Sequence, residues 1–180
     1  MALVDIVATP GGRYAKQVLF KAIGPEGQRK IAESTITVIG LGALGTVIAS
    51  DLCRAGVGHL RIIDRDFVEL SNLQRQILFD EQDAYERMPK AIAVERKLRA
   101  VNSEIEIEPS VADVDASNIE RLIEGSTVVL DGTDNLETRF LINDACVKNG
   151  IPWVCGGALG SMGNVMTVVP GETPCLRCLI

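Results

Sequence analysis

Residues 35–45, Thr-Ile-Thr-Val-Ile-Gly-Leu-Gly-Ala-Leu-Gly, decide the fold of this chain. The apolar first half predicts a buried strand, and the second half has the spacing G-x-G-x-x-G at the start of a helical pattern that continues over 46–55. Gly40 would allow the tight turn, and Gly42 would let backbone N–H groups approach a phosphate. Gly45 would let the helix pack closely on the strand. The stretch therefore predicts a nucleotide site, without saying which nucleotide.

Apolar strands and helices alternate along the rest of the chain. A second strand ends in Asp64, about 20 residues past the glycines, where a Rossmann-type unit holds a ribose hydroxyl. Ser117 and Glu120 have capping-box spacing and predict the start of one helix. The alternation predicts an α/β fold, a Rossmann-like and mostly parallel sheet with helices on both faces. Strands are expected over 34–39, 60–63, 105–108, 127–131, 152–155 and 164–169, and helices over 25–33, 46–55, 90–101, 117–123 and 135–149.

Length and charge restrict the class of protein. The chain of 180 residues fits one domain, with an arm and helix over 1–33 and a nucleotide-binding core over 34–180. The net charge of -6 argues against nucleic acid as a partner, because a nucleic-acid backbone requires a basic face. We find no apolar run long enough to span a membrane and no signal peptide, so we expect a cytoplasmic protein.

Four of the five cysteines divide into two kinds. Without a secretion signal, a disulfide framework is not expected. Cys53 and Cys146 fall on apolar helix faces and are expected to be buried, inert thiols. Cys175 and Cys178 have the Cys-x-x-Cys spacing of zinc ligands, but a structural zinc site needs four ligands. This pair supplies half of such a site.

Several polar residues follow the ends of predicted strands or lie near them. Because ligands of open α/β sheets bind at the carboxyl ends of the strands, we expect Asp64, Asp66 and the segment 131–135 to converge on one crevice. Arg75 and Lys90 could offset the charge of a nucleoside triphosphate, and Asp134 in this segment could hold its magnesium ion. Taken singly, each has an ordinary alternative as a solvated surface charge or, for Asp134, a helix cap.

Seven motifs occur in an order that resembles the ThiF/MoeB/HesA family, the bacterial relatives of ubiquitin-activating enzymes. The resemblance spans nearly the whole chain, and its Ser-Asn-Leu-Gln-Arg-Gln block is specific. The motifs are Arg13-Tyr-Ala-Lys-Gln17, Gly40-Leu-Gly-Ala-Leu-Gly45, Ile63-Asp-Arg-Asp66, Ser71-Asn-Leu-Gln-Arg-Gln76, Pro89-Lys90, Asp131-Gly-Thr-Asp-Asn135 and Pro174-Cys-Leu-Arg-Cys178.

The resemblance implies an ATP-dependent adenylyltransferase that acts on the C-terminal glycine carboxylate of a ubiquitin-like sulfur-carrier protein ending in Gly-Gly and releases pyrophosphate. It implies that Arg13, Arg75, Lys90 and Asp134 take part in catalysis, with Asp134 on magnesium. In family dimers the arm arginine, Arg13 here, reaches the ATP of the neighbouring subunit, so a homodimer is expected. The residues implied in nucleotide binding are Gly40, Gly42, Ala43, Leu44, Gly45, Asp64, Asp66, Asn72, Gln76, Asp134 and Asn135, besides the phosphate-binding Arg75 and Lys90.

The resemblance also implies parts that this sequence lacks. The family has a second Cys-x-x-Cys pair, so we expect the chain to be incomplete at its C-terminus, with zinc bound only in the complete protein and with this fragment potentially inactive. In the family, residues 158–169 would lie near the docking surface of the carrier.

Three other functions remain open. A related family member could activate a small-molecule or tRNA-linked carboxylate, although the acidic charge favours a protein carrier. An NAD-dependent oxidoreductase fits the glycine turn and Asp64 equally well, but it needs no triphosphate clamp of the kind that Arg75, Lys90 and Asp134 suggest. The chain could also bind a nucleotide without turnover.

Overall fold

The structure, a computed structural model, describes residues 12–179. Part of the expected arm, residues 1–11, and the last residue therefore lie outside the described part. Six strands form one sheet in the order β3-β2-β1-β4-β5-β6. The strands are β1 (Thr35–Ile39), β2 (His59–Ile63), β3 (Glu106–Ser110), β4 (Val128–Asp131), β5 (Trp153–Leu159) and β6 (Met162–Val168).

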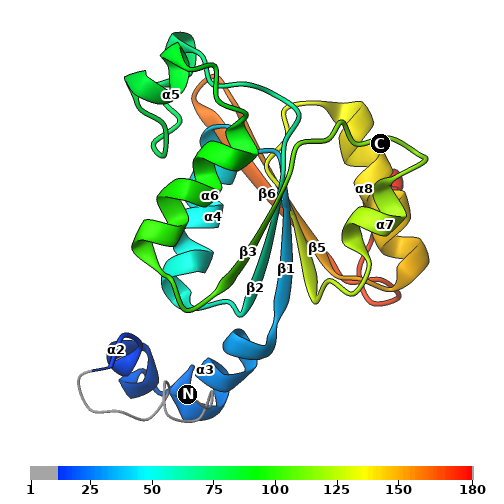
Figure 1. Cartoon of the computed structure of the whole chain (residues 1–180). Coiled ribbons are helices and arrows are strands. Elements are labelled where there is room, and N and C mark those ends of the chain that lie inside the picture. The colour runs from blue at the N-terminus through cyan, green and yellow to red at the C-terminus, as the bar shows by residue number, and fades with distance from the viewer. Residues whose placement is uncertain (1–11, 180) are drawn as a thin grey trace.

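Helices cover both faces of this sheet (Figure 1). Helices α4 and α6 lie on one face, and α7 and α8 lie on the other. All neighbouring strands are parallel except β6, which runs antiparallel to β5. This arrangement confirms the predicted Rossmann-like class. The helices are α2 (Ala15–Leu19), α3 (Gly24–Glu33), α4 (Ala43–Ala55), α5 (Glu81–Tyr85), α6 (Lys90–Val101), α7 (Ile119–Ile123) and α8 (Leu136–Asn149), with short 3₁₀ turns η1 (Leu70–Asn72) and η2 (Leu176–Cys178).

Two apolar layers hold the helices on the sheet. Val38 faces the layer beneath α4 and α6, whereas its neighbour Ile39 faces the layer beneath α7 and α8. This difference follows from strand geometry, because successive side chains point to opposite faces. Trp153 is fully buried in the second layer. Cys53 and Cys146 are buried as predicted, and burial raises the pKa of the Cys146 thiol to about 12.

Some element boundaries differ from those expected. The prediction that Ser117 caps a helix was wrong: α7 begins at Ile119, and the Ser117 backbone N–H and hydroxyl both donate to Asp115 instead. A serine side chain can bond a local turn as readily as a helix end, and the turn prevails here. Helix α5 was not predicted, although Asp80 and Asp83 form a reciprocal capping box at its start.

The N-terminal helices lie at the end of the sheet where β1 begins (Figure 1). Tyr14 is buried there, and its hydroxyl accepts a hydrogen bond of 2.8 Å from Asn102. A Cβ atom at Gly56 would lie 2.4 Å from the Tyr14 ring, so this glycine is needed for the ring to dock. Within residues 12–179, no helix has both the length and the apolar character required to cross a membrane.

Candidate functional site

A crevice of about 1070 Å³ opens at the carboxyl ends of β1, β2 and β4. It brings together segments that are far apart in the sequence, as the strand-end argument predicted. Among the residues named from the sequence, the lining includes Gly40, Gly42, Ala43, Leu44, Asp64, Asp66, Asn72, Arg75, Gln76, Lys90, Asp134 and Asn135.

The glycine turn at one wall of this crevice has no room for a side chain at Gly40 or at Gly45. Gly40 has a φ of +87°, a conformation that other residues rarely adopt. A Cβ atom at Gly45 would lie 1.8 Å from the Gly40 carbonyl oxygen, and one at Gly132 would lie 2.8 Å from the same oxygen. Gly45 is not among the crevice-lining residues, so its role is the close packing of helix on strand.

The start of α4 faces the crevice through Gly42, Ala43 and Leu44. Gly42 occupies the N-cap position, and no side chain caps this helix. The first backbone N–H groups of a helix have no partner within the helix, and the helix dipole adds partial positive charge there. These groups therefore form an anion site suited to a phosphate.

Asp64 connects the glycine turn to the end of β2. Its carboxylate accepts hydrogen bonds from the backbone N–H groups of Leu41, at 2.6 Å, and Asp66, at 2.7 Å. Burial raises the pKa of this carboxyl group, although both hydrogen bonds act in the opposite direction. Asp64 thus holds the turn in place while it lines the crevice.

Two cations reach the crevice from different environments. Lys90, at the start of α6, is only 6% exposed, and its Nζ lies 3.1 Å from Oδ2 of Asp66. A buried ammonium is costly unless it is paired, and this partner is itself half-exposed. Arg75 is exposed, and its Nη1 donates to the Ser71 carbonyl. Lys90 could therefore meet an anionic ligand from within the crevice, and Arg75 could meet it from the exposed rim.

Two buried amides complete this side of the crevice. Asn72 is fixed by its Oδ1, which accepts from the Glu69 backbone N–H at 3.1 Å. Gln76 is 3% exposed, and its Oε1 has no hydrogen-bond partner within the described part of the chain. Its Nε2 would lie 3.9 Å from a Cβ atom at Gly42. A buried unpaired amide oxygen beside the glycine turn is a polar group that a ligand could satisfy.

The opposite wall follows β4. Asp134 is exposed and makes no hydrogen bond or ion pair within residues 12–179, so its carboxylate is free to bind a cation. The alternative role of Asp134 as a helix cap was wrong, because Asn135 caps α8. The Asn135 Oδ1 accepts from the backbone N–H groups of Glu137, at 2.9 Å, and Thr138, at 3.2 Å.

The sequence reasoning missed one prominent group, the ion pair between Asp131 and Arg139. The Nε of Arg139 donates to Oδ2 of Asp131 at 2.7 Å, and Arg139 lines the crevice. The spacing of eight residues belongs to no simple periodic pattern, because the chain leaves a strand, turns and enters α8 between them. Only a charged residue at the very end of an apolar strand hinted at a buried partner.

Arg13 does not reach the crevice of its own chain. Its Nη1 donates to the Val101 carbonyl at 3.0 Å, and its Nε lies 3.3 Å from a Glu104 carboxylate oxygen. The two contacts lie at the last residue of α6 and just after it, before β3 begins. Arg13 therefore lies away from the crevice of its own chain, and its expected contact with the ATP of a neighbouring subunit stays a prediction.

Cys175 and Cys178 form a compact pair at η2. Their Sγ atoms are 3.7 Å apart, close to the ~3.8 Å expected for two thiolates on one tetrahedral zinc ion. The Leu176 backbone N–H donates to Oδ1 of buried Asn143, which holds η2 on α8. Within residues 12–179, no group of three or more potential metal ligands is found. The pair fits half of a zinc site.

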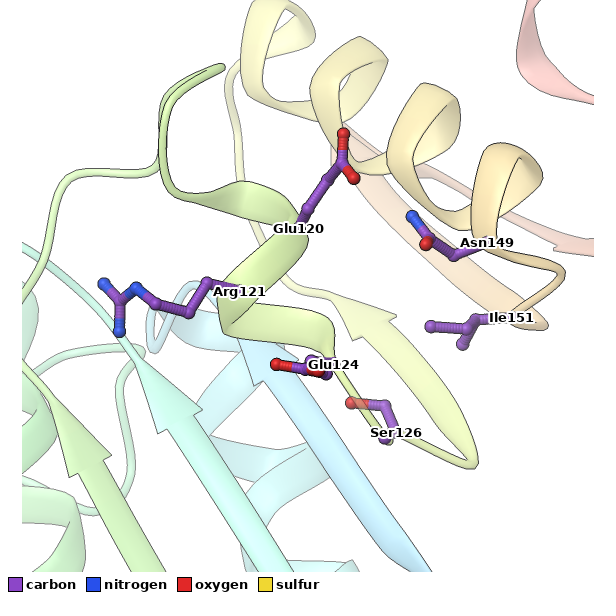
Figure 2. Close-up of a pocket in the computed structure, with 7 residues that line it drawn as sticks. Glu120, Arg121, Glu124, Ser126, Asn149 and Ile151 are labelled. Carbon is purple, nitrogen blue, oxygen red and sulfur yellow. The ribbon is translucent and has the colours of Figure 1, made fainter.

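A second hollow, of about 530 Å³, lies at the opposite end of the sheet from the crevice. Figure 2 shows Glu120 and Arg121 on α7, with Asn149 and Ile151 near the end of α8. Its lining lies in the segments before β4 and before β5, at the amino ends of these strands, and contains none of the residues predicted for the site. Because ligands of such sheets bind at the carboxyl ends of the strands, this hollow is not the candidate site.

Comparison with known proteins supplies a family for this geometry. The model of the ThiF family matches residues 14–180. The chain is 53% identical over 169 residues to the sulfur carrier protein ThiS adenylyltransferase of Bacillus subtilis, which covers 94% of this chain and 50% of that protein. It is 41% identical over 176 residues to the SAMP-activating enzyme E1 of Haloferax volcanii, which covers 98% of this chain and 64% of that protein.

Solved structures share the fold. The crystal structure of E. coli MccB with AMPCPP and selenomethionine MccA has a TM-score of 0.85 and 25% sequence identity, and the match covers 94% of this chain and 52% of that one. The chain spans 50% of the length of the Bacillus subtilis relative and 64% of the length of the Haloferax volcanii relative.

Proposed function

The chain belongs to the ThiF family, and on that premise we propose that it forms the nucleotide-binding part of an enzyme that uses ATP to adenylate the C-terminal carboxylate of a ubiquitin-like sulfur-carrier protein. The observation that carries the proposal is the convergence of buried Lys90, the uncapped start of α4 and the free carboxylate of Asp134 on one crevice. The relative named as a sulfur carrier protein adenylyltransferase supports the same substrate class.

The crevice divides into a nucleoside side and a phosphate side. Asp64 lies at the end of β2, where an acidic residue in a Rossmann-type unit holds ribose hydroxyls. The start of α4 would receive phosphate oxygens, with Lys90 and Arg75 offsetting their charge. Gln76, whose Oε1 lacks a partner among the described residues, would gain one from the ligand or from its water.

The reaction needs positioning more than proton transfer. A carboxylate oxygen of the carrier attacks the α-phosphorus, the bond from that phosphorus to the bridging oxygen breaks, and pyrophosphate leaves with the bonding electrons. Because a C-terminal carboxylate is already ionised near neutral pH, no general base is required. The cations of the crevice would stabilise charge that grows on the leaving oxygens. A site with no histidine in its lining is compatible with this chemistry.

The metal requirement is also part of the proposal. Asp134 would hold a magnesium ion, since a carboxylate that is free of protein partners is the ligand type that Mg²⁺ prefers beside phosphates. The ion would offset negative charge on the triphosphate when bound.

The partners follow from the surroundings of the crevice. Leu159 and Met162, on the hairpin of β5 and β6, line the crevice and are strongly exposed. This hairpin would guide the tail of the carrier toward the α-phosphate. A homodimer would bring Arg13 to the neighbouring subunit, and zinc would be held by Cys175 and Cys178 together with ligands outside this chain.

The test is pyrophosphate–ATP exchange by the full-length protein with magnesium and a purified carrier that ends in Gly-Gly. Exchange should require the carrier, and a carrier lacking its last glycine serves as the matched control. If the protein binds ATP but shows no exchange with any Gly-Gly carrier, the proposal is wrong. Exchange with a small carboxylic acid in place of the carrier would instead indicate the related small-molecule activity.

A further inference from the structure

Arg139 connects three segments that border the crevice. Its Nε donates to Oδ2 of Asp131, at 2.7 Å, where β4 ends. Its Nη2 donates both to the Thr133 carbonyl, at 2.8 Å, and to the Gly156 carbonyl in β5, at 2.9 Å. One guanidinium therefore fixes the end of β4, the loop that follows it and the middle of β5.

Asp131 completes this network. The residue is fully buried, and its second oxygen accepts from the Thr133 backbone N–H, at 2.8 Å, and from the Thr133 hydroxyl, at 2.6 Å. Both carboxylate oxygens are thus occupied within the chain. A buried ion pair adds little net stability compared with apolar residues of similar volume, so its presence at the crevice wall suggests a role other than stability.

The loop held by Arg139 is also confined from the other side. A Cβ atom at Gly132 would lie 2.8 Å from the Gly40 carbonyl oxygen and 2.9 Å from the Gly45 backbone nitrogen. The loop therefore packs directly against the glycine turn. Thr133, whose carbonyl Arg139 holds, is followed by Asp134. Gly156 is followed by Gly157, which lines the crevice.

We propose that Arg139, paired with Asp131, is a positioning residue that sets the distance between Asp134 and the β5–β6 hairpin across the glycine turn. The inference rests on the proposed function, because it assigns Asp134 and the hairpin to the phosphate and carrier sides of the crevice. Two of the three guanidinium nitrogens, Nε and Nη2, donate to acceptors on three segments, whereas Arg75 donates through Nη1 alone, to the Ser71 carbonyl four residues before it. Arg139 therefore acts through the backbone that it holds.

The first test is Arg139→Lys in the full-length protein. Lysine keeps the charge beside Asp131, but a single ammonium cannot reach acceptors on three segments in the geometry of a planar fork. AMP affinity should stay within about threefold, since the Asp64 side is untouched, while the kcat of exchange should fall by about 100-fold. Arg61→Lys is the matched control: Arg61 bonds Glu108 and the Glu124 carbonyl outside the crevice, so its variant should exchange normally.

Two results would overturn the inference. One is exchange by Arg139→Lys within threefold of the wild type, and the other is an equal loss of AMP binding and exchange, which would indicate a general structural role. If Arg139→Lys does not fold, the double variant Asp131→Asn/Arg139→Gln, which removes both charges of the pair, decides instead. A folded, AMP-binding double variant that exchanges normally overturns the inference, and one that has lost exchange supports it. Failure of the proposed function is distinct, because the wild type itself would then show no exchange.

Discussion

The Nζ of Lys90 lies 3.1 Å from Oδ2 of Asp66, and the two residues also share a backbone hydrogen bond of 2.9 Å from the Lys90 N–H to the Asp66 carbonyl. The chain thus fixes the first turn of α6 to the segment that follows β2. The ammonium is buried, while its carboxylate partner is half-exposed. This geometry holds a positive charge in the crevice before any ligand arrives, which is the arrangement that lowers the cost of reorganisation in catalysis.

Lys90→Met should therefore remove activity without unfolding the protein. We expect exchange to fall by at least about 100-fold, because the negative charge that develops on the leaving oxygens loses one preorganised cation that stabilises it. The melting temperature should change little, since methionine fills a similar volume without a buried charge. Lys97→Met is the control: Lys97 pairs with Asp80 and Asp83 outside the crevice, so its variant should keep exchange activity. Equal exchange by the Lys90→Met variant and the wild type would contradict this role.

Asp134→Asn tests the proposed magnesium ligand. Asp134 makes no hydrogen bond or ion pair in the part of the chain that the structure describes, so the substitution should leave the melting temperature unchanged. Exchange should fall by about 100-fold and should require a higher magnesium concentration, because an amide oxygen is a weaker ligand than a carboxylate. The measurement is exchange rate against magnesium concentration. An unchanged magnesium dependence would assign the ion to other ligands.

Gly45→Ala should destabilise the fold. The new Cβ atom would lie 1.8 Å from the Gly40 carbonyl oxygen, so either α4 or the turn must move. We expect a loss of more than about 3 kcal/mol in the free energy of unfolding, measured by urea titration. Gly27→Ala in α3 is the control, because there the nearest atom is a side-chain carbon of Ile23 at 3.3 Å. Its effect should stay within about 1 kcal/mol, since alanine favours a helix.

Asn135→Ala should weaken the start of α8. The Asn135 side chain accepts from two backbone N–H groups, and loss of such a cap costs about 1 kcal/mol. Ser117→Ala provides the comparison, because Ser117 bonds Asp115 in an exposed turn and caps no helix. Its cost in unfolding free energy should be the smaller of the two. A larger loss of unfolding free energy for Ser117→Ala than for Asn135→Ala would support the capping role that the sequence pattern predicted for Ser117.

Cys146 should make stability fall at alkaline pH. Its thiol has a pKa of about 12 in the fold against an ordinary value of 9.0, so the folded state retains a proton that the unfolded state has lost. The contribution is therefore complete below about pH 9 and is lost as pH rises toward 12. Relative to Cys146→Ala, wild-type unfolding free energy should drop by about 1 kcal/mol between about pH 8 and about pH 10. Parallel pH profiles for the two proteins would contradict this.

Local patterns were sufficient for most of the fold. The glycine spacing and the apolar strand before it predicted β1 and α4, and Pro89 with its following apolar stripe predicted α6 from Lys90 to Val101. Predictions failed where two local interactions compete, as at Ser117, or where an element is too short for periodicity to show, as at α5. The antiparallel pairing of β5 with β6 was not predicted, and it extends β5 to Leu159, beyond the expected end at residue 155, because strand pairing continues across Gly156 and Gly157.

The sequence by itself determined the class of sheet, the glycine turn and the polar residues that follow the strand ends, because each depends on neighbours within a few positions. Tertiary structure alone decided that Arg139 bonds Asp131, Thr133 and Gly156, that Gln76 is buried beside Gly42, and that Arg13 lies away from its own crevice. Such contacts join residues on different elements, and their geometry depends on how the sheet brings those elements together. No periodic pattern along the chain predicts how far apart such residues lie in the fold.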